Sequence, residues 1–118
     1  MDLSAKQTVD AICKALAEKK AIDIKILQVN GLTDVADYFI ICSGKSMPQV
    51  HAIFDYLEEK TEELGITCFH KEGFKECRWI ALDYGNVVVH IFHSTSREFY
   101  QLDKLWNNGS NVVTYVEE

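Results

Sequence analysis

The sequence lacks the features that mark disordered, fibrous or membrane-spanning chains. Its 118 residues include a single proline, Pro48, and contain no Gly/Ser-rich linker and no internal repeat. Such a composition predicts one folded domain over residues 1–118. No apolar run approaches the roughly 20 residues that a helix needs to cross a bilayer. The N-terminus also lacks the pattern of a secretion signal, so we expect a cytoplasmic protein without membrane contact.

Basic residues and paired cysteines are also scarce. The chain has 12 Lys and Arg against 18 Asp and Glu, a net charge of −6, and this balance argues against a direct nucleic-acid site. An acidic domain is better matched to a basic protein partner. The four cysteines form no Cys-x-x-Cys pair, and they are predicted to be reduced thiols rather than a disulfide framework.

The spacing of apolar residues predicts an α/β (α+β) domain, in which a mixed β-sheet carries its helices mainly on one face. Helical spacing is found at residues 4–20, 47–64 and 96–106. Strand-like alternation or short β-prone runs occupy residues 21–29, 36–44, 66–70, 78–84, 87–93 and 111–116.

The third predicted helix, residues 96–106, begins at a candidate capping box. Thr95 and Glu98 have the spacing of that motif. Phe99, with Leu102 and Leu105/Trp106, is predicted to face the core, while Arg97, Tyr100 and Lys104 are predicted to share the outer side.

The segment RWIALDYGNVVVHIFH, residues 78–93, predicts a β-hairpin with Gly85-Asn86 as its two-residue loop. Counting outward from the loop gives the register, so that Tyr84 pairs with Val87 and Trp79 with Phe92. One face then carries ordinary core residues: Ile80, Leu82, Val87, Val89 and Ile91. The other face carries rings with polar tips, a mixture enriched at protein interfaces: Trp79, Ala81, Asp83, Val88, His90 and Phe92. The sequence allows this second face to be either open or covered by a helix.

The tripeptide Gly44-Lys45-Ser46 resembles the end of a phosphate-binding loop. That loop needs a further glycine five positions earlier, where this chain has Phe39 inside a predicted strand. The tripeptide is better interpreted as a helix start, with Ser46 as the N-cap, Gln49 completing a capping box and Pro48 in the first turn. A helix N-terminus attracts anions, but these residues identify no ligand.

Catalytic and metal-binding patterns are weak. Cys68, His70 and Cys77 lack the spacing of a metal signature, so we expect no metal and no other cofactor. Asp83 and His90 would be diagonal neighbours on the hairpin, which permits an acid–base pair, but no nucleophile follows from the register. We therefore expect a protein that is not an enzyme. The alternatives are an enzyme that binds a nucleotide or small molecule and an RNA-binding module, which the charge disfavours.

Two stretches carry a resemblance to a known family. The segments DYFIICSGKSMPQVHAI and KEGFKECRWIALDYGNVVVHIFHSTSREFYQLDKLW closely resemble the ribosomal silencing factor (Iojap-like) family, and the similarity covers nearly the whole chain from the first helix onward. Its most specific parts include Trp79, the Asp83-Tyr84-Gly85 turn, Arg97 and Tyr100. This chain departs from the family at Gly85-Asn86, where Gly-Asp is common.

The resemblance implies a fold like that of nucleotidyltransferase domains, without their catalytic acidic residues. It implies binding to ribosomal protein fourteen of the large subunit, on the intersubunit face. There the protein would obstruct joining of the small subunit and lower translation when nutrients are scarce. It also implies a homodimer when the protein is free.

The hairpin face and the family resemblance together predict a partner-binding surface. Its aromatic side chains would fill pockets of a basic ribosomal protein, and Asp83 would pair with a Lys or Arg. The residues predicted to supply most of the contact are Trp79, Asp83, Tyr84, His90, Phe92, Arg97 and Tyr100.

Overall fold

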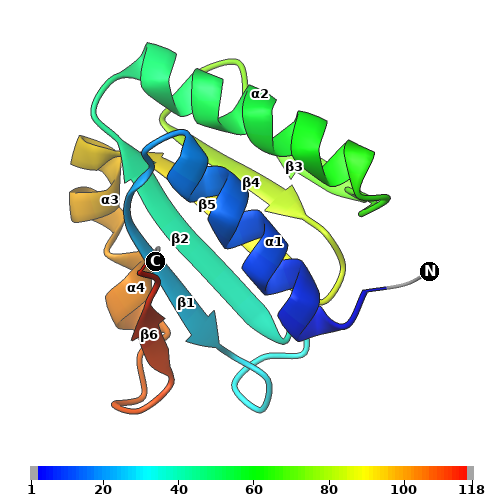
Figure 1. The fold of residues 1–118 in the computed structure, drawn as a ribbon. Helices are drawn as coiled ribbons and strands as arrows, with labels where there is room; N and C mark the ends of the chain where they lie inside the picture. The colour runs from blue at the N-terminus through cyan, green and yellow to red at the C-terminus, as the bar shows by residue number, and fades with distance from the viewer. Residues whose placement is uncertain (1–2, 117–118) are drawn as a thin grey trace.

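Two long helices lie side by side across one face of a six-stranded sheet (Figure 1). The computed structural model describes residues 3–116. Its helices are α1 (Ala5–Glu18), α2 (Met47–Glu63), α3 (Ser94–Tyr100) and α4 (Leu102–Leu105). Its strands are β1 (Ile22–Gln28), β2 (Tyr38–Gly44), β3 (His70–Glu72), β4 (Trp79–Asp83), β5 (Val87–His93) and β6 (Val112–Thr114). Within the described residues, no helix is both long and apolar enough to cross a membrane.

The strand order in the sheet is β3-β4-β5-β2-β1-β6. β2 and β5 run parallel, while the other neighbouring pairs among the described strands are antiparallel. Parallel neighbours need a long crossover connection, and here α2, β3 and β4 lie between the two strands in the chain. The predicted mixed sheet is therefore confirmed, with the parallel pair at its centre.

The sheet face under α1 and α2 carries the larger core. Ile12 and Leu16 of α1, like Ile53 and Leu57 of α2, are no more than 1% exposed. They belong to one buried cluster with the strand residues predicted for this face: Ile80, Leu82, Val87, Val89 and Ile91. Burying one such side chain stabilises the fold by roughly 1.5–3 kcal/mol. This layer therefore anchors the hairpin that carries the candidate site.

The opposite face of the sheet carries a smaller core, which α4 covers in part. Its buried members are Leu27, Val29, Ala36, Phe39, Ile41, Val88 and Phe92. Leu102 of α4 and the following Trp106 pack against this cluster and are themselves only partly buried. No residue of α3 or α4, all of which the structure describes, is buried. The two short helices thus form a thin, partial cover, and the long helices lie on one face as predicted.

Side-chain caps begin both long helices. At α1, the Ser4 hydroxyl accepts a hydrogen bond from the Gln7 N–H at 3.1 Å, and the Gln7 side chain accepts one from the Ser4 N–H at 2.9 Å. At α2, the Ser46 hydroxyl accepts from the Gln49 N–H at 3.2 Å, as predicted. The Gln49 side chain accepts from the Lys45 N–H at 2.7 Å rather than from Ser46, so the predicted box is half formed. The Gly-Lys-Ser tripeptide is thus a helix start.

Three predicted elements differ from the structure. The strand expected at 66–70 lies at His70–Glu72 instead, because the Ile66 N–H bonds the Thr61 carbonyl at 2.8 Å and ties the preceding segment to the end of α2. The helix expected at 96–106 is two helices, because Gln101 takes a left-handed conformation with φ 50°. It also starts earlier, capped by His93 rather than by a Thr95 box. The last strand is shorter than expected, Val112–Thr114.

Candidate protein-binding surface

The hairpin of β4 and β5 has the register predicted from its loop. Trp79 pairs with Phe92, Ala81 with His90, and the remaining pairs follow in step. Gly85 takes φ 94°, a conformation that side chains disfavour. Its N–H donates a hydrogen bond to Oδ1 of Asp83 at 2.8 Å. A glycine and an aspartate therefore fix the turn, and the turn fixes which residues share the second face.

A stack of aromatic rings rises from this second face toward solvent. Trp79 stacks on Phe92 with ring centroids 5.0 Å apart, and Tyr100 of α3 lies against Trp79, also at 5.0 Å. Phe99 meets Tyr100 edge-on at 5.0 Å. Exposure increases along the stack: Phe92 is fully buried, Trp79 is half-buried, Tyr100 is 52% exposed and Phe99 is 79% exposed. We call these four rings the aromatic stack.

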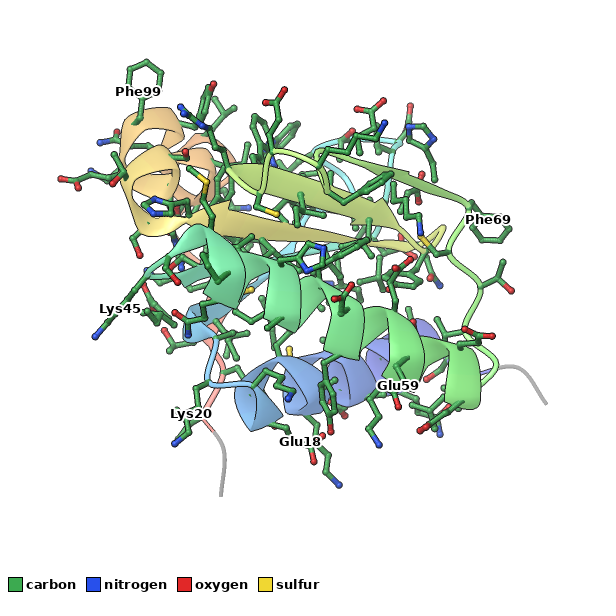
Figure 2. The ribbon with its side chains drawn as sticks, turned by 90° about the horizontal axis from the view of Figure 1, so that it is seen from above. Glu18, Lys20, Lys45, Glu59, Phe69 and Phe99 are labelled. Atoms are coloured by element: carbon green, nitrogen blue, oxygen red, sulfur yellow. The ribbon has the colours of Figure 1, made fainter. Side chains whose placement is uncertain are left out.

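Phe99 projects from the end of the molecule where α3 lies, whereas Phe69 projects from the opposite end (Figure 2). Both rings are largely exposed, Phe69 at 70%. The exposure of Phe99 corrects the predicted inward stripe of the last helix. The predicted stripe fails at Phe99 because the helix breaks at Gln101, so Phe99 no longer continues the face on which Leu102 and Trp106 pack against the core.

His90 fixes the orientation of Trp79. Its Nδ1 accepts a hydrogen bond from the Trp79 indole N–H at 3.0 Å, so the neutral ring carries its proton on Nε2. His90 is 8% exposed, and burial lowers its pKa from 6.5 to about 4. Nε2 has no hydrogen-bond partner within the described part of the chain. Since its indole N–H is used internally, Trp79 presents carbon and the face of its ring to solvent.

Asp83 and His90 each bond a different group. The Asp83 carboxylate caps the hairpin turn at Gly85, and the acceptor nitrogen of His90 is taken by Trp79. The acid–base pair that their diagonal positions permitted is therefore not the arrangement in the structure. Asp83 is half-buried beside His70, its cross-strand partner at the edge of the sheet.

Tyr84 lies on the other side of the sheet from the aromatic stack. It is 5% exposed, and its hydroxyl is 3.2 Å from the hydroxyl of Thr61 in α2. Burial raises the pKa of this phenol above its ordinary value. The predicted placement of Tyr84 with the outward rings needs correction, because Tyr84 follows Ile80 and Leu82 at two-residue spacing and shares their core-facing side. That spacing is visible in the sequence.

Arg97 faces inward, which corrects its predicted outer position. Its side chain is 10% exposed. Nη1 donates to the Ile22 carbonyl at 3.1 Å and to the Ser43 hydroxyl at 3.3 Å. Nη2 lies 3.3 Å from Asp103 and 3.4 Å from Asp23. The sequence gives no local signal for this cluster, because its members come from four separate elements or their junctions.

A hollow of about 490 Å³ lies beside the stack. Trp79, Phe99 and Tyr100 line it together with Gly73, Glu76, Arg78, Thr95 and Ser96. Gly73 takes φ 83°, and a Cβ there would collide with the carbonyl oxygen of Trp79. The glycine thus lets the β3–β4 connection close on the stack, and the hollow gives a protruding partner side chain a place to bind.

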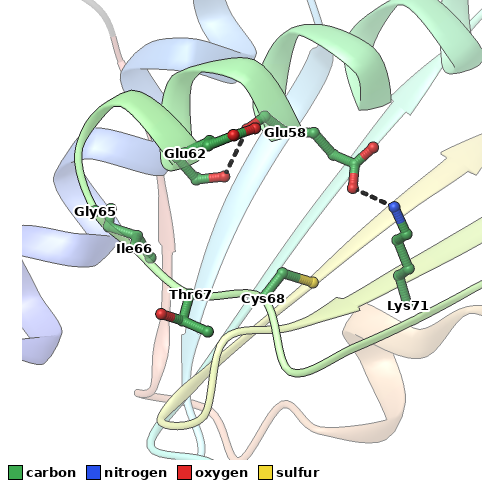
Figure 3. Close-up of a pocket in the computed structure, with 8 residues that line it drawn as sticks. Glu58, Glu62, Gly65, Ile66, Thr67, Cys68 and Lys71 are labelled. Atoms are coloured by element: carbon green, nitrogen blue, oxygen red, sulfur yellow. Dashed lines mark hydrogen bonds and ion pairs between the residues drawn. The ribbon is translucent and has the colours of Figure 1, made fainter.

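A second hollow, of about 480 Å³, lies between the end of α2 and β3 (Figure 3). Lys71 spans it to Glu58, with 2.6 Å between Nζ and Oε2. Burial raises the pKa of the Cys68 thiol that lines it, so this thiol is held in its protonated, weakly nucleophilic form. The hollow therefore offers a neutralised ion pair rather than a reactive centre.

The candidate metal ligands of the sequence have other partners. Nε2 of His70 is 2.9 Å from Glu72, the Cys68 thiol donates to the His70 carbonyl, and the Cys77 thiol donates to the Phe74 carbonyl. Across residues 3–116, no three His, Cys, Asp or Glu side chains are grouped so as to hold a metal ion.

An acidic domain with exposed aromatic rings anchored on a hairpin has features that are enriched in protein-binding modules. Comparisons with known proteins give the family. The family model described as "Ribosomal silencing factor during starvation" matches residues 2–118. The ribosomal silencing factor of Bacillus subtilis is 42% identical over 106 residues, which cover 90% of each chain.

Solved structures agree with this match. A protein from Bacillus halodurans has a TM-score of 0.81 at 36% identity, covering 92% of this chain and 97% of that one. A protein from Chromobacterium violaceum has a TM-score of 0.87 at 28% identity, covering 98% and 95%. The chain belongs to the ribosomal silencing factor family. As a member of this family, the protein is a regulator and not an enzyme.

Proposed function

We propose that this protein binds the large ribosomal subunit through ribosomal protein fourteen on the intersubunit face, and so blocks joining of the small subunit. Translation would fall when nutrients are scarce. Membership of the silencing factor family supports a ribosomal partner, and the sequence resemblance supports this particular protein of the subunit. The protein acts in the cytoplasm, without a cofactor.

The observation that carries the proposal is the aromatic stack. Its exposed end, Tyr100 and Phe99, provides large apolar rings, while its buried end, Phe92, fixes them to the sheet. Rings held in this way lose little conformational freedom on binding, which favours affinity. Aromatic side chains in well-packed pockets are the residues that most often dominate interface energies.

The charge of the domain supports a basic partner. A net charge of −6 favours encounter with a Lys- and Arg-rich ribosomal protein. Asp83, half-buried at the edge of the stack face, would pair with one such side chain through the oxygen that does not cap the turn.

The seven residues predicted for the surface take three roles in this proposal. Trp79, Asp83 and Tyr100 contact the partner. His90 and Phe92 support them from below, because one bonds the Trp79 indole and the other lies buried beneath it. Tyr84 and Arg97 lie elsewhere in the fold and stabilise the hairpin and α3.

Steric blockade requires only a bulky body on the subunit face. The described part of the protein measures 34 × 32 × 30 Å, and a body of this size would occupy the surface on which it docks. We also propose that the free protein is a homodimer, since apolar side chains away from the stack are exposed, Val113 and Val116 among them. Sedimentation velocity of the free protein over a range of concentrations would test this.

Co-sedimentation with isolated large subunits tests the docking surface. Tyr100→Ala is expected to cost about 2 kcal/mol or more, which is roughly a 30-fold loss of affinity. Phe69→Ala is the control, because Phe69 is another exposed ring and lies at the end of the molecule opposite to α3 (Figure 2). Wild-type binding by a correctly folded Tyr100→Ala protein would remove this surface from consideration.

A further inference from the structure

We propose that Arg97 is a positioning residue, which presets the docking surface by clamping α3 and α4 to β1 and does not itself touch the partner. The inference rests on the proposed function for the identity of that surface. It replaces the direct contact that the sequence predicted for Arg97. Four observations carry it: the bonds of the guanidinium, the bulge in β1, the break at Gln101 and the position of Tyr100.

The guanidinium is almost fully enclosed, and its bonds reach several elements. Its two terminal nitrogens bond the carbonyl of Ile22 and the hydroxyl of Ser43 on one side and two carboxylates, Asp23 and Asp103, on the other. Lys25 lies 3.9 Å from Asp103 and 4.0 Å from Asp23, so two cations balance two anions. A planar fork of donors suits this set of acceptors, whereas a single ammonium does not.

A β-bulge creates the socket for this side chain. The register of β1 against β2 shifts between Ile22 and Lys25, and Asp23 takes φ 48° within the shift. A bulge leaves backbone groups of its strand outside the ladder. Here the carbonyl of Ile22 accepts from Arg97 at 3.1 Å and from the Ser43 hydroxyl at 3.4 Å. The carbonyl that the bulge leaves outside the ladder therefore gains a donor, and the guanidinium gains an acceptor.

The bonds of the Arg97 guanidinium, which we call the clamp, also bridge the break between α3 and α4. Gln101 ends α3 in a left-handed conformation and begins α4, while the Arg97–Asp103 pair joins the two helices across it. Neither helix, both within the described residues, buries a residue of its own. A seven-residue helix is marginal without tertiary anchoring. The ion pair thus sets the angle at which α3 leaves the sheet.

Tyr100 follows Arg97 by one helical turn, so the position of α3 sets the position of its ring. That ring covers Trp79 at 5.0 Å between centroids. If the clamp opens, α3 is free to move and Tyr100 no longer holds Trp79 in place. Arg97 thus acts on docking through Tyr100, and its effect depends on Tyr100 being present.

A double-variant comparison separates this role from direct contact. Arg97→Lys and Asp103→Asn are each expected to weaken co-sedimentation with large subunits about tenfold, while Lys104→Ala, an exposed neighbour of Asp103, leaves it unchanged. Because Arg97 acts through Tyr100, the Arg97→Lys/Tyr100→Ala double variant is expected to dock like Tyr100→Ala alone. Losses that simply add, or wild-type docking by Arg97→Lys, would overturn the proposal.

Trp79 supplies a readout that does not depend on the ribosome. The chain has two tryptophans, so a Trp106→Phe background leaves Trp79 as the only fluorophore of this kind. Opening the clamp is expected to increase acrylamide quenching of Trp79 in Arg97→Lys and in Asp103→Asn, and unchanged quenching in both would refute the clamp.

If Tyr100→Ala docks normally, the proposed surface fails, but the quenching experiment still decides the role of Arg97. If Arg97→Lys fails to fold, Asp103→Asn carries the same two tests.

Discussion

Replacing His90 by asparagine is expected to remove one defined contribution to the acid sensitivity of this fold. The imidazole is 8% exposed, and its Nδ1 accepts the indole N–H of Trp79. Asparagine places a side-chain oxygen near the position of Nδ1, so the acceptor for Trp79 is kept. Asparagine does not titrate, and the substitution therefore isolates the proton equilibrium of His90 from its hydrogen bond.

The sign and size of the effect follow from burial. Burial lowers the pKa of His90 in the folded protein to about 4, against 6.5 for an exposed histidine. The unfolded chain therefore binds a proton that the folded protein does not, and the free energy of unfolding falls as the pH drops from about 6.5 to about 4. Each pH unit in that window costs about 1.4 kcal/mol. Between pH 7 and pH 4.5 the wild type is expected to lose about 2 to 3 kcal/mol more than His90→Asn.

Urea unfolding followed by circular dichroism at the two pH values measures this difference. Carboxylates titrate in the same range, but they do so in both proteins, so their contribution cancels in the comparison. His70→Asn is the control at an exposed ring and is expected to keep most of the wild-type pH dependence. Equal pH dependence in His90→Asn and wild type would show that His90 is not held neutral beneath Trp79.

Other substitutions test separate contacts. Gly73→Ala is expected to destabilise the fold by about 2 kcal/mol or more in urea unfolding, because its φ is 83° and its Cβ would collide with the Trp79 carbonyl. Gly65→Ala, with φ 72° but open space around it, is expected to cost only about 1 kcal/mol, and equal losses would argue against the collision. Tyr84→Phe is expected to cost about 1 kcal/mol through its lost bond to Thr61 while leaving docking intact. Impaired docking of folded Tyr84→Phe would contradict its placement under α2.

The hairpin could be predicted from the sequence because its determinants are local. A two-residue loop at Gly85-Asn86 fixes the register, and strict alternation then assigns every residue of β4 and β5 to a face. The same alternation, continued by two residues from Leu82, puts Tyr84 on the core side. The predicted contact of Tyr84 with the partner does not follow from this register, and the burial of Tyr84 against Thr61 agrees with the alternation.

The position of Arg97 could not be predicted in this way. Its partners Ile22 and Asp23 are more than seventy residues away in the chain, and the bulge that exposes them depends on the pairing of β1 with β2. The break at Gln101 has no local signal either, because glutamine rarely adopts positive φ. Tertiary contacts decide both features. They turn Arg97 inward and leave Phe99 and Leu105 exposed, while Leu102 and Trp106 pack against the core as predicted.

The neighbour relationship of β2 and β5 is likewise non-local. Nothing in either strand specifies a parallel partner across the intervening α2, β3 and β4. The sequence predicted a mixed sheet from the arrangement of elements but gave no strand order. That order matters for the site, because it places Phe39 of β2 edge-on to His90 at 5.2 Å between ring centroids and so closes the pocket that keeps the histidine neutral.

Light scattering, followed while purified protein is titrated onto large subunits, measures directly whether the protein blocks subunit joining. Wild-type protein is expected to slow and then abolish formation of assembled ribosomes. Tyr100→Ala is predicted to need roughly 30 times more protein for the same effect, and Phe69→Ala to match the wild type. Normal joining of subunits saturated with wild-type protein would contradict the proposal that this domain silences ribosomes by occupying their interface.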